Sequence, residues 1–395
     1  MANSLRAHWI LDPEIVFLNH GSFGACPKPV LAAQQALRER LEREPVLFLG
    51  RELEARVDAA RAELAPFVGA EPEDIVPVSN ATTGVNAVLE SIELSPGDEL
   101  LLTNHGYNAC RNAAERAAGH AGAKVVVADV PFPLRSEDEV VQAVLVRASP
   151  RTRIALLDHV TSPTGLVFPI ERLVRELAKR GIDTLVDAAH APGMVPVDIR
   201  ALDPAYYTGN LHKWVCAPKG AAFLYVRRDL QARVRPPVVS HGANSPRTDR
   251  SRFRLEFDFT GTDDPTAFLV VPECLRFLGG LFPGGWDELR RRNRELVLRA
   301  RAILCDALGI DEPAPESMIS SLASVPLPPG KQAGRPDAFT IDPLQRTLFE
   351  QHRIEVPVMP WPAPPRRLLR VSAQAYNEVG EYETLANALR ELVPA

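Results

Sequence analysis

The chain has 395 residues, of which 46% are hydrophobic and 24% charged, and its formal net charge at pH 7 is −5. This length exceeds what one core normally supports, so we expect a large and a small domain. No basic tract stands apart from acidic residues, which argues against a protein that binds nucleic acid or an anionic membrane.

Targeting and redox features agree with a cytoplasmic protein. The chain starts with polar and charged residues in place of a signal peptide, and no run reaches the roughly 18 apolar residues of a membrane span. Neither a disulfide framework nor a metal site is indicated, because the five cysteines are scattered and form no C-x-x-C pair. These are Cys26, Cys110, Cys216, Cys274 and Cys305.

Helical and strand-like patterns alternate along the first two thirds of the chain. Residues 29–66 are rich in alanine, leucine, arginine and glutamate and predict helix, and residues 170–180 predict another that ends at Gly181. Short apolar runs predict strands at 99–102, 124–127, 154–157 and 184–186. Strands that alternate with helices predict a mostly parallel sheet covered by helices on both faces.

The last third of the chain has a different pattern and predicts a smaller α+β domain. Helices are expected at 266–278 and 286–308, with a glycine- and proline-rich turn at 279–285 between them. Two further proline-rich stretches, 326–330 and 357–365, predict surface loops, and the second is a candidate to lie near a substrate.

Residues 209–214 read Gly-Asn-Leu-His-Lys-Trp, and Lys213 follows the strand-end residue Asp187 by 26 positions. Ligands of parallel sheets bind beyond the carboxyl ends of the strands, where Asp187 would lie. A lysine amine can bind an aldehyde, an aspartate can keep a pyridine nitrogen protonated, and a helix start with hydroxyls, such as residues 80–84, can hold a phosphate. Each motif alone has an ordinary explanation, a surface pair or a helix cap, but together they predict a pyridoxal-phosphate site.

The order of these motifs resembles the fold type I, class V aminotransferase-like superfamily over nearly the whole chain. The motifs are Asn-Ala-Thr-Thr-Gly-Val-Asn at 80–86, Asp-Ala-Ala-His at 187–190, His-Lys-Trp at 212–214, Gly-Thr at 261–262 and Leu-Arg-Val-Ser-Ala-Gln-Ala-Tyr-Asn at 369–377. Leu-Asn-His-Gly-Ser-Phe-Gly at 18–24 and Trp214 resemble its isopenicillin N epimerase-like branch, which also includes C–S lyases of ergothioneine formation.

The resemblance implies a division of the chain and an assembly. Residues 25–265 would form the large α/β cofactor-binding domain and residues 266–395 the small C-terminal domain. Residues 1–24 would pack on the small domain and on the active site. Gly261 and Thr262 resemble a turn that reaches the phosphate of the neighbouring subunit, which implies a homodimer with shared sites.

For the cofactor, the resemblance implies that Lys213 holds it covalently and later acts as acid and base at the substrate Cα. Asp187 would pair with the pyridine nitrogen, and His190 would lie near the phenolic oxygen of the ring. Ser162 stands where related enzymes carry an asparagine that touches the same oxygen, although a role in a turn fits it equally. The implied phosphate ligands are Ala81, Thr82, Thr83, Asn210 and His212.

Two side chains compete for the place above the cofactor ring, and others would bind the substrate. We favour Tyr107 over His105, because a flat phenol ring stacks well on a π-system. Arg370 would bind the substrate carboxylate through two parallel hydrogen bonds. The remaining implied substrate-binding residues are Asn19, His20 and Ser22, with His20 available as a proton donor.

The resemblance leaves the reaction open. Cysteine desulfurases carry a thiol on a loop before the carboxylate-binding arginine, whereas Glu355 stands there in this chain. A C–S β-lyase acting on a cysteine S-conjugate or sulfoxide needs only Lys213 and a leaving group. An epimerase acting on an antibiotic precursor needs a second acid, for which His20 or Tyr107 are candidates. We favour the lyase and keep open decarboxylation, transamination and a non-catalytic cofactor-binding protein.

Overall fold

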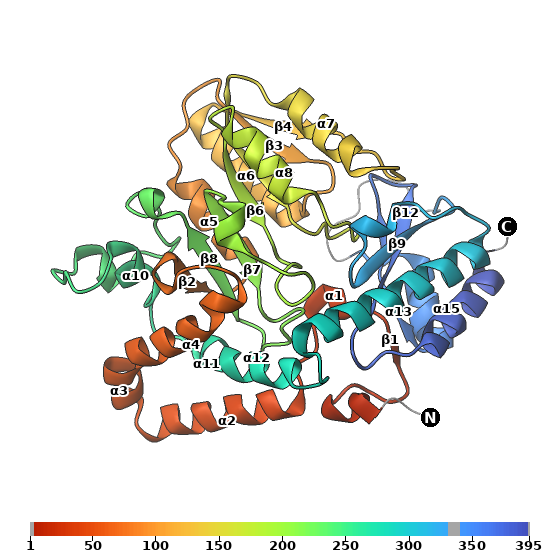
Figure 1. Cartoon of the computed structure of the whole chain (residues 1–395), viewed down its shortest axis with the longest axis horizontal. Coiled ribbons are helices and arrows are strands. Elements are labelled where there is room, and N and C mark those ends of the chain that lie inside the picture. Colours follow the sequence, from red (N-terminus) through yellow and green to blue (C-terminus); the bar gives the residue numbers. More distant parts are fainter. Residues whose placement is uncertain (1–3, 331–339, 394–395) are drawn as a thin grey trace.

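A seven-stranded sheet forms the centre of the computed structural model, which describes residues 4–330 and 340–393 (Figure 1). Its strand order is β2-β8-β7-β6-β5-β3-β4. The parallel strands are β3 (Glu99–Thr103), β4 (Lys124–Ala128), β5 (Thr152–Asp158), β6 (Asp183–Asp187) and β7 (Tyr206–Asn210). β8 (Ala222–Val226) runs antiparallel to β7 and to β2 (Ile75–Val78). The predicted strands and the mostly parallel sheet are confirmed.

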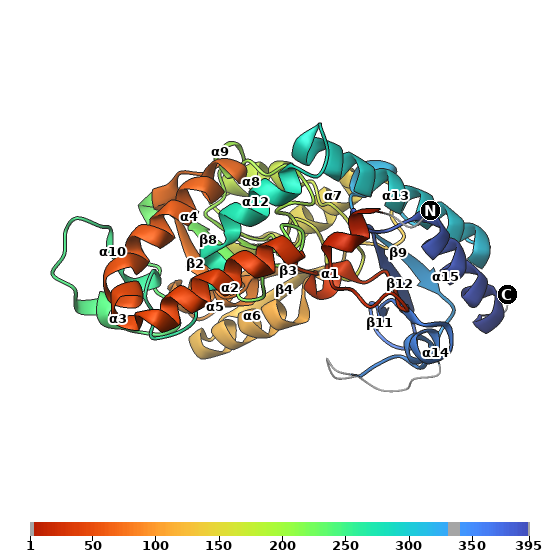
Figure 2. The ribbon, with the colours of Figure 1, turned by 90° about the horizontal axis from the view of Figure 1, so that it is seen from below.

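Helices cover both faces of this sheet, as predicted (Figure 2). Successive residues of β3 show why, since Leu101 packs into one hydrophobic core and Leu100 and Leu102 pack into another. α7 (Glu137–Arg147) and α8 (Ile170–Ala178) contribute to the first core. α5 (Ala81–Ser91) and α6 (Asn108–Ala121) contribute to the second.

The predicted helical region 29–66 is present as α2 (Lys28–Arg43), α3 (Pro45–Leu47), a π-helical turn (Phe48–Glu52) and α4 (Leu53–Phe67). The single helix predicted at 266–278 is wrong, because the chain forms α11 (Thr266–Leu269) and α12 (Val271–Gly279). Pro272 explains the break, since a proline is tolerated only in the first turn of a helix. α11 and α12 pack on α2 and α4, although the predicted domain division places them in the C-terminal part.

A three-stranded antiparallel sheet, in the order β11-β12-β9, forms the C-terminal part. Its strands are β9 (Leu322–Leu327), β11 (Val358–Pro360) and β12 (Arg367–Ser372), so both proline-rich stretches predicted as loops are partly strand. α13 (Gly285–Leu308) and α15 (Val379–Leu392) lie side by side on this sheet (Figure 1), and α14 (Pro343–His352) precedes β10 (Ile354–Glu355). The smaller α+β portion is therefore present as predicted.

The N-terminal segment packs against both the loop after β7 of the seven-stranded sheet and β12 of the three-stranded sheet. β1 (Val16–Phe17) pairs with β10, and α1 (His20–Phe23) leads into Gly24, which has a φ of 70°. A Cβ at Gly24 would lie 2.0 Å from the carbonyl oxygen of His212, so only glycine fits there. The segment thus packs directly on the loop that carries Lys213. Among the described residues, no helix is long and apolar enough to span a membrane.

Candidate active site at the carboxyl ends of the strands

Asp187 ends β6 and lies at the carboxyl edge of the sheet, where ligands of such folds bind. Its Oδ1 atom accepts a hydrogen bond from the amide of Ala189 at 3.0 Å, and Oδ2 accepts one from the thiol of Cys110 at 3.1 Å. Asp158 is its register partner on β5, and burial together with the charge of Asp187 raises the pKa of Asp158 well above its ordinary value. Burial and this neighbour therefore favour the neutral form of Asp158.

Lys213 lies in the loop after β7, and its Nζ atom is 3.0 Å from Nε2 of His190. Burial, reinforced by the charge of Arg370, lowers the pKa of Lys213 to about 7. Burial and the charge of Lys213 also lower the pKa of His190 well below its ordinary value. With a pKa of about 7, a substantial share of the amine is neutral at neutral pH, and beside a neutral imidazole it can act as a nucleophile or as a base.

Arg370 extends from β12 and is 3% exposed. Its Nη1 atom donates to the carbonyl oxygen of Ser162 at 2.5 Å and to the Ser162 hydroxyl at 3.2 Å, and Nη2 donates to the hydroxyl of Ser22 at 3.1 Å. Within residues 4–330 and 340–393 the guanidinium contacts no carboxylate, and its buried Nε has no partner. Burial lowers its pKa to about 10. A buried guanidinium without a counterion fits a substrate carboxylate.

The start of α5 provides the predicted phosphate end of the site. The amide of Thr83 donates to the side chain of Asn80, and the amide of Ala81 donates to Oδ1 of Asn210 at 2.8 Å. Thr82 is in the first turn and its amide has no intrahelical partner. Nδ1 of His212 is buried and has no partner among the described residues. Asn210 therefore positions this helix start, where the amide of Thr82 is available to a phosphate, and the phosphate contacts of Thr83 and His212 stay predictions.

The structure separates the two candidates for the place above the ring. His105 is fully buried, and its ring nitrogens contact the hydroxyl of Thr164 and the carbonyl oxygen of Val130. Tyr107 instead precedes α6 and is 48% exposed, and burial together with the charge of Asp187 raises its pKa. Of these two candidates, Tyr107 is the one whose hydroxyl interacts electrostatically with Asp187 and Arg370, and its stacking on the cofactor stays a prediction.

The structure gives no support to the expectation that His20 donates a proton to the substrate. The imidazole is fully buried, with Nδ1 2.7 Å from the hydroxyl of Tyr376 and Nε2 3.0 Å from the carbonyl oxygen of Lys213. Burial lowers its pKa to about 3. His20 therefore fixes the backbone at Lys213. The pattern around residue 20 could not show this, because its partners lie on distant segments.

The other predicted residues have the following places. Ser22 donates to Asn19, which donates to Glu355, so both belong to the hydrogen-bonded chain behind Arg370. Ser162 contacts Arg370, and its predicted contact with the cofactor ring remains a prediction. The turn at Gly261–Thr262 is at the surface of the single chain, so its role in a neighbouring subunit also remains a prediction.

Two residues near Asp187 were missed from the sequence. Cys110 is three residues after Tyr107, close to one helical turn, and so points to the same region of the sheet edge. Asp158 ends the apolar run that predicted β5, as Asp187 ends the run for β6. The shared position at two strand ends was the signal that could have identified Asp158.

Comparison with known proteins identifies the family. A profile of class-V aminotransferases matches residues 21–326. The chain belongs to the aminotransferase class-V family. It is similar to an isopenicillin N epimerase of Amycolatopsis lactamdurans, with 39% identity over 97% of this chain and 96% of that protein. It is also similar to a protein of Arabidopsis thaliana named "Probable L-cysteine desulfhydrase, chloroplastic", with 33% identity over 97% of this chain and 84% of the relative.

A solved structure supports the fold of this class-V chain. The cysteine desulfurase CsdA of Escherichia coli superposes with a TM-score of 0.78 and 22% identity, covering 98% of each chain. At that identity the likeness concerns the fold alone.

The residues of this class-V chain fit pyridoxal phosphate. The amine of Lys213, with its pKa lowered to about 7, can hold an aldehyde, Asp187 can pair with a ring nitrogen, and the start of α5, which Asn210 contacts, can hold a phosphate. Together with family membership, this fit identifies pyridoxal phosphate as the cofactor, as the sequence predicted. The chain is thus a pyridoxal-phosphate enzyme of the lyase or epimerase kind found among its relatives.

Proposed function

We propose that this class-V enzyme is a C–S β-lyase that cleaves a cysteine S-conjugate or its sulfoxide. The proposal rests on a Lys213 amine whose pKa is lowered to about 7 and on a His20 whose two ring nitrogens are both bonded within the protein, since β-elimination needs proton removal from one face only. The named cysteine desulfhydrase relative supports a sulfur-containing substrate.

Each step of the proposed reaction uses a residue already described. Arg370 binds the substrate carboxylate and so decides which bond at Cα stands ready to break. Lys213 takes the Cα proton, and the thio group leaves from Cβ. Bound pyridoxal phosphate supplies the electron sink for the carbanion. Asp187 would pair with the ring nitrogen of the bound cofactor and keep it protonated.

The cysteines do not favour sulfur transfer through a protein persulfide. All five lie in the described part of the chain and all are buried. Burial raises the pKa of Cys26 to about 12 and of Cys305 to about 11, which disfavours the thiolate needed for such chemistry. Glu355, at the position where desulfurases carry their thiol, is bonded to Asn19.

Epimerisation is the second candidate, and Tyr107 is the observation that favours it. Its raised pKa keeps the phenol protonated, so it could deliver a proton to the face of Cα opposite Lys213. The 39% identity to an isopenicillin N epimerase supports the same candidate.

One experiment separates the candidates. Cysteine S-conjugates, their sulfoxides and peptide-linked L-amino acids would be incubated with the enzyme in deuterated water and followed by NMR and mass spectrometry. Pyruvate and ammonia, with a released thiol or sulfenic species, support the lyase. Deuterium at Cα with inversion and without fragmentation supports the epimerase. Loss of carbon dioxide supports decarboxylation, and transfer of the amino group supports transamination. No exchange with any substrate would support a non-catalytic role.

We further propose that two chains form a dimer with shared sites, supported by the surface position of Gly261–Thr262. The test mixes two inactive proteins. One carries Lys213→Ala, and the other carries both Gly261→Ala and Thr262→Ala. Recovered activity on mixing supports shared sites, whereas a monomer by light scattering contradicts them.

A further inference from the structure

The indole of Trp214 lies against the histidine that faces Lys213. Its Nε1 atom donates to Nδ1 of His190 at 3.3 Å, while Nε2 of the same ring lies 3.0 Å from the Lys213 amine. Trp214 and His190 are each 1% exposed. No water can therefore replace the indole as the partner of Nδ1 without a change in packing.

The donor in this contact decides where the imidazole carries its proton. An indole nitrogen can only donate, so Nδ1 of His190 must accept and carries no proton. Burial, and next the positive charges of Lys213 and Arg370, keep the ring neutral. A neutral imidazole has one N–H, and here it must lie on Nε2, the atom that faces Lys213.

The proton on Nε2 in turn constrains the lysine. An ammonium group has donors only, so it cannot share a hydrogen bond with an N–H that points at it. A neutral amine has a lone pair that accepts one. The arrangement therefore favours the neutral form of Lys213, in agreement with a pKa lowered to about 7.

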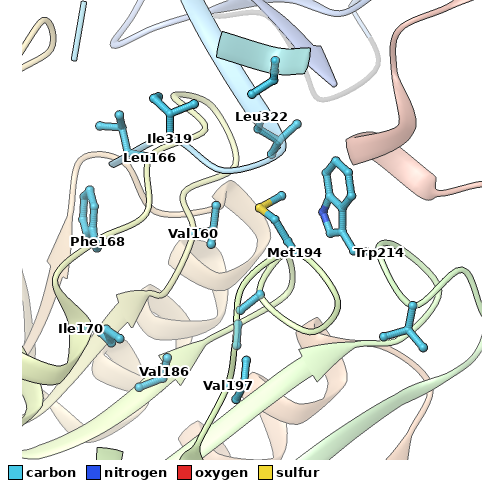
Figure 3. Close-up of a cluster of buried hydrophobic side chains, with 14 of the residues drawn as sticks. Val160, Leu166, Phe168, Ile170, Val186, Met194, Val197, Trp214, Ile319 and Leu322 are labelled. Atoms are coloured by element: carbon cyan, nitrogen blue, oxygen red, sulfur yellow. The ribbon is translucent and has the colours of Figure 1, made fainter. Parts of the chain in front are cut away.

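Packing holds Trp214 in this place. Figure 3 shows its indole beside Met194 and Leu322, in the hydrophobic core between the large sheet and β9. Gly193 has a φ of 87° and allows the loop after His190 to lie close to the backbone of Trp214. A Cβ at Gly193 would lie 2.6 Å from the carbonyl carbon of Trp214. The core residues around the indole and the close approach at Gly193 together fix the position of the Trp214 indole relative to the His190 imidazole.

We propose that Trp214 is a positioning residue that fixes His190 as the tautomer protonated on Nε2, so that His190 always presents a donor to Lys213. The importance of this tautomer for catalysis rests on the proposed function. The test of the tautomer needs no substrate, so the tautomer proposal and the proposed function can fail separately.

NMR of the full-length protein with ¹⁵N-labelled histidine tests the tautomer directly, with and without cofactor. The His190→Gln variant identifies the His190 signals among those of the nine histidines. We expect an unprotonated Nδ1, a protonated Nε2 and a scalar coupling across the hydrogen bond to the Trp214 indole. A proton on Nδ1 in the wild-type protein overturns the proposal, and this result does not depend on any Trp214 variant folding.

Trp214→Phe removes the indole N–H and keeps an aromatic ring. Without that donor, His190 can carry its proton on Nδ1, and Nε2 can then stabilise a charged Lys213. We expect altered His190 signals and, in the cofactor-free protein at neutral pH, roughly fivefold slower reductive methylation of Lys213 by formaldehyde and cyanoborohydride, measured on its peptide.

Trp361→Phe is the matched control. Trp361 is also buried, but its indole nitrogen has no partner among the described residues, so this change should leave both readouts at the wild-type values. A folded Trp214→Phe protein with wild-type His190 signals and wild-type methylation of Lys213 would contradict the proposal.

Discussion

The thiol of Cys110 on α6 donates to Oδ2 of Asp187 at 3.1 Å, while the amide of Ala189 occupies Oδ1. Burial and the charge of Asp187 raise the pKa of Cys110 well above its ordinary value, so the thiol keeps its proton and remains a donor. The carboxylate that would hold the cofactor ring is thus fixed by two donors and retains lone pairs for the ring nitrogen.

Removal of this thiol should weaken catalysis without unfolding the protein. We expect Cys110→Ala to lower kcat/KM by roughly tenfold, because one hydrogen bond to a charged group is worth about 1.5 kcal/mol. Steady-state kinetics measures the effect. Cys274→Ala is the control, since that buried thiol in α12 donates to the carbonyl oxygen of Val270, just before the helix. Equal losses in the two variants would assign the effect to packing alone.

The purified protein should be yellow, and borohydride should fix the cofactor on Lys213. The neutral amine of Lys213 is the group that can bind an aldehyde, whereas Lys219 is exposed and donates to the carbonyl oxygen of Gly24. Peptide mapping after reduction locates the label. Lys213→Ala should lose it and Lys219→Ala should retain it. Label on Lys219, or on no lysine, would falsify the assignment of the cofactor lysine.

The charge of Asp187 should contribute far more to kcat than the neighbouring carboxyl group of Asp158. Asp187→Ala is expected to lower kcat by about a thousandfold, several kcal/mol, because the ring then loses the anion that keeps it an electron sink. Asp158→Asn is the matched change at the adjacent strand end, where burial and Asp187 raise the pKa and favour the neutral acid. We expect its effect to stay within about tenfold. Turnover of Asp187→Ala within tenfold of wild type would show that the ring has another partner.

Arg370→Lys keeps the charge but loses the planar, two-pronged geometry. We expect KM to rise about a hundredfold, some 2–3 kcal/mol, and the product ratio to change, since the carboxylate no longer fixes the bond that breaks. Arg367→Lys, on the same strand and paired with Asp342, serves as the control and should leave KM unchanged. The assignment fails if Arg370→Lys has the KM and products of wild type with every amino-acid substrate tried.

The stability of the cofactor-free protein should depend on pH through Lys213. Its folded pKa is about 7, lowered from 10.5, so between these values the unfolded chain binds more protons than the folded one. Folding therefore becomes more favourable as pH rises through this window, by a few kcal/mol at most. Denaturant unfolding of wild type and Lys213→Met measures the difference. If the two proteins show the same pH dependence from 7 to 10.5, the buried amine is not what titrates.

Much of this protein follows from its sequence. Local periodicity is a short-range property, and it was enough to predict the strands of the sheet and the helices around them. Residue type and order were enough to single out Lys213, Asp187 and Arg370, because an amine, an anion and a guanidinium have few substitutes in this chemistry. The family and the cofactor followed from the same pattern.

The tertiary structure decided which atoms meet. His20 is a proton donor by residue type, but burial and bonds to Tyr376 and the Lys213 backbone make it a structural group. Asn210 holds the amide of Ala81 although its position suggested a phosphate ligand. A contact such as that of Cys110 with Asp187 joins residues 77 positions apart. Sequence patterns record spacing along the chain, whereas protonation, tautomer and hydrogen-bond partner depend on burial and on neighbours that only the folded chain brings together.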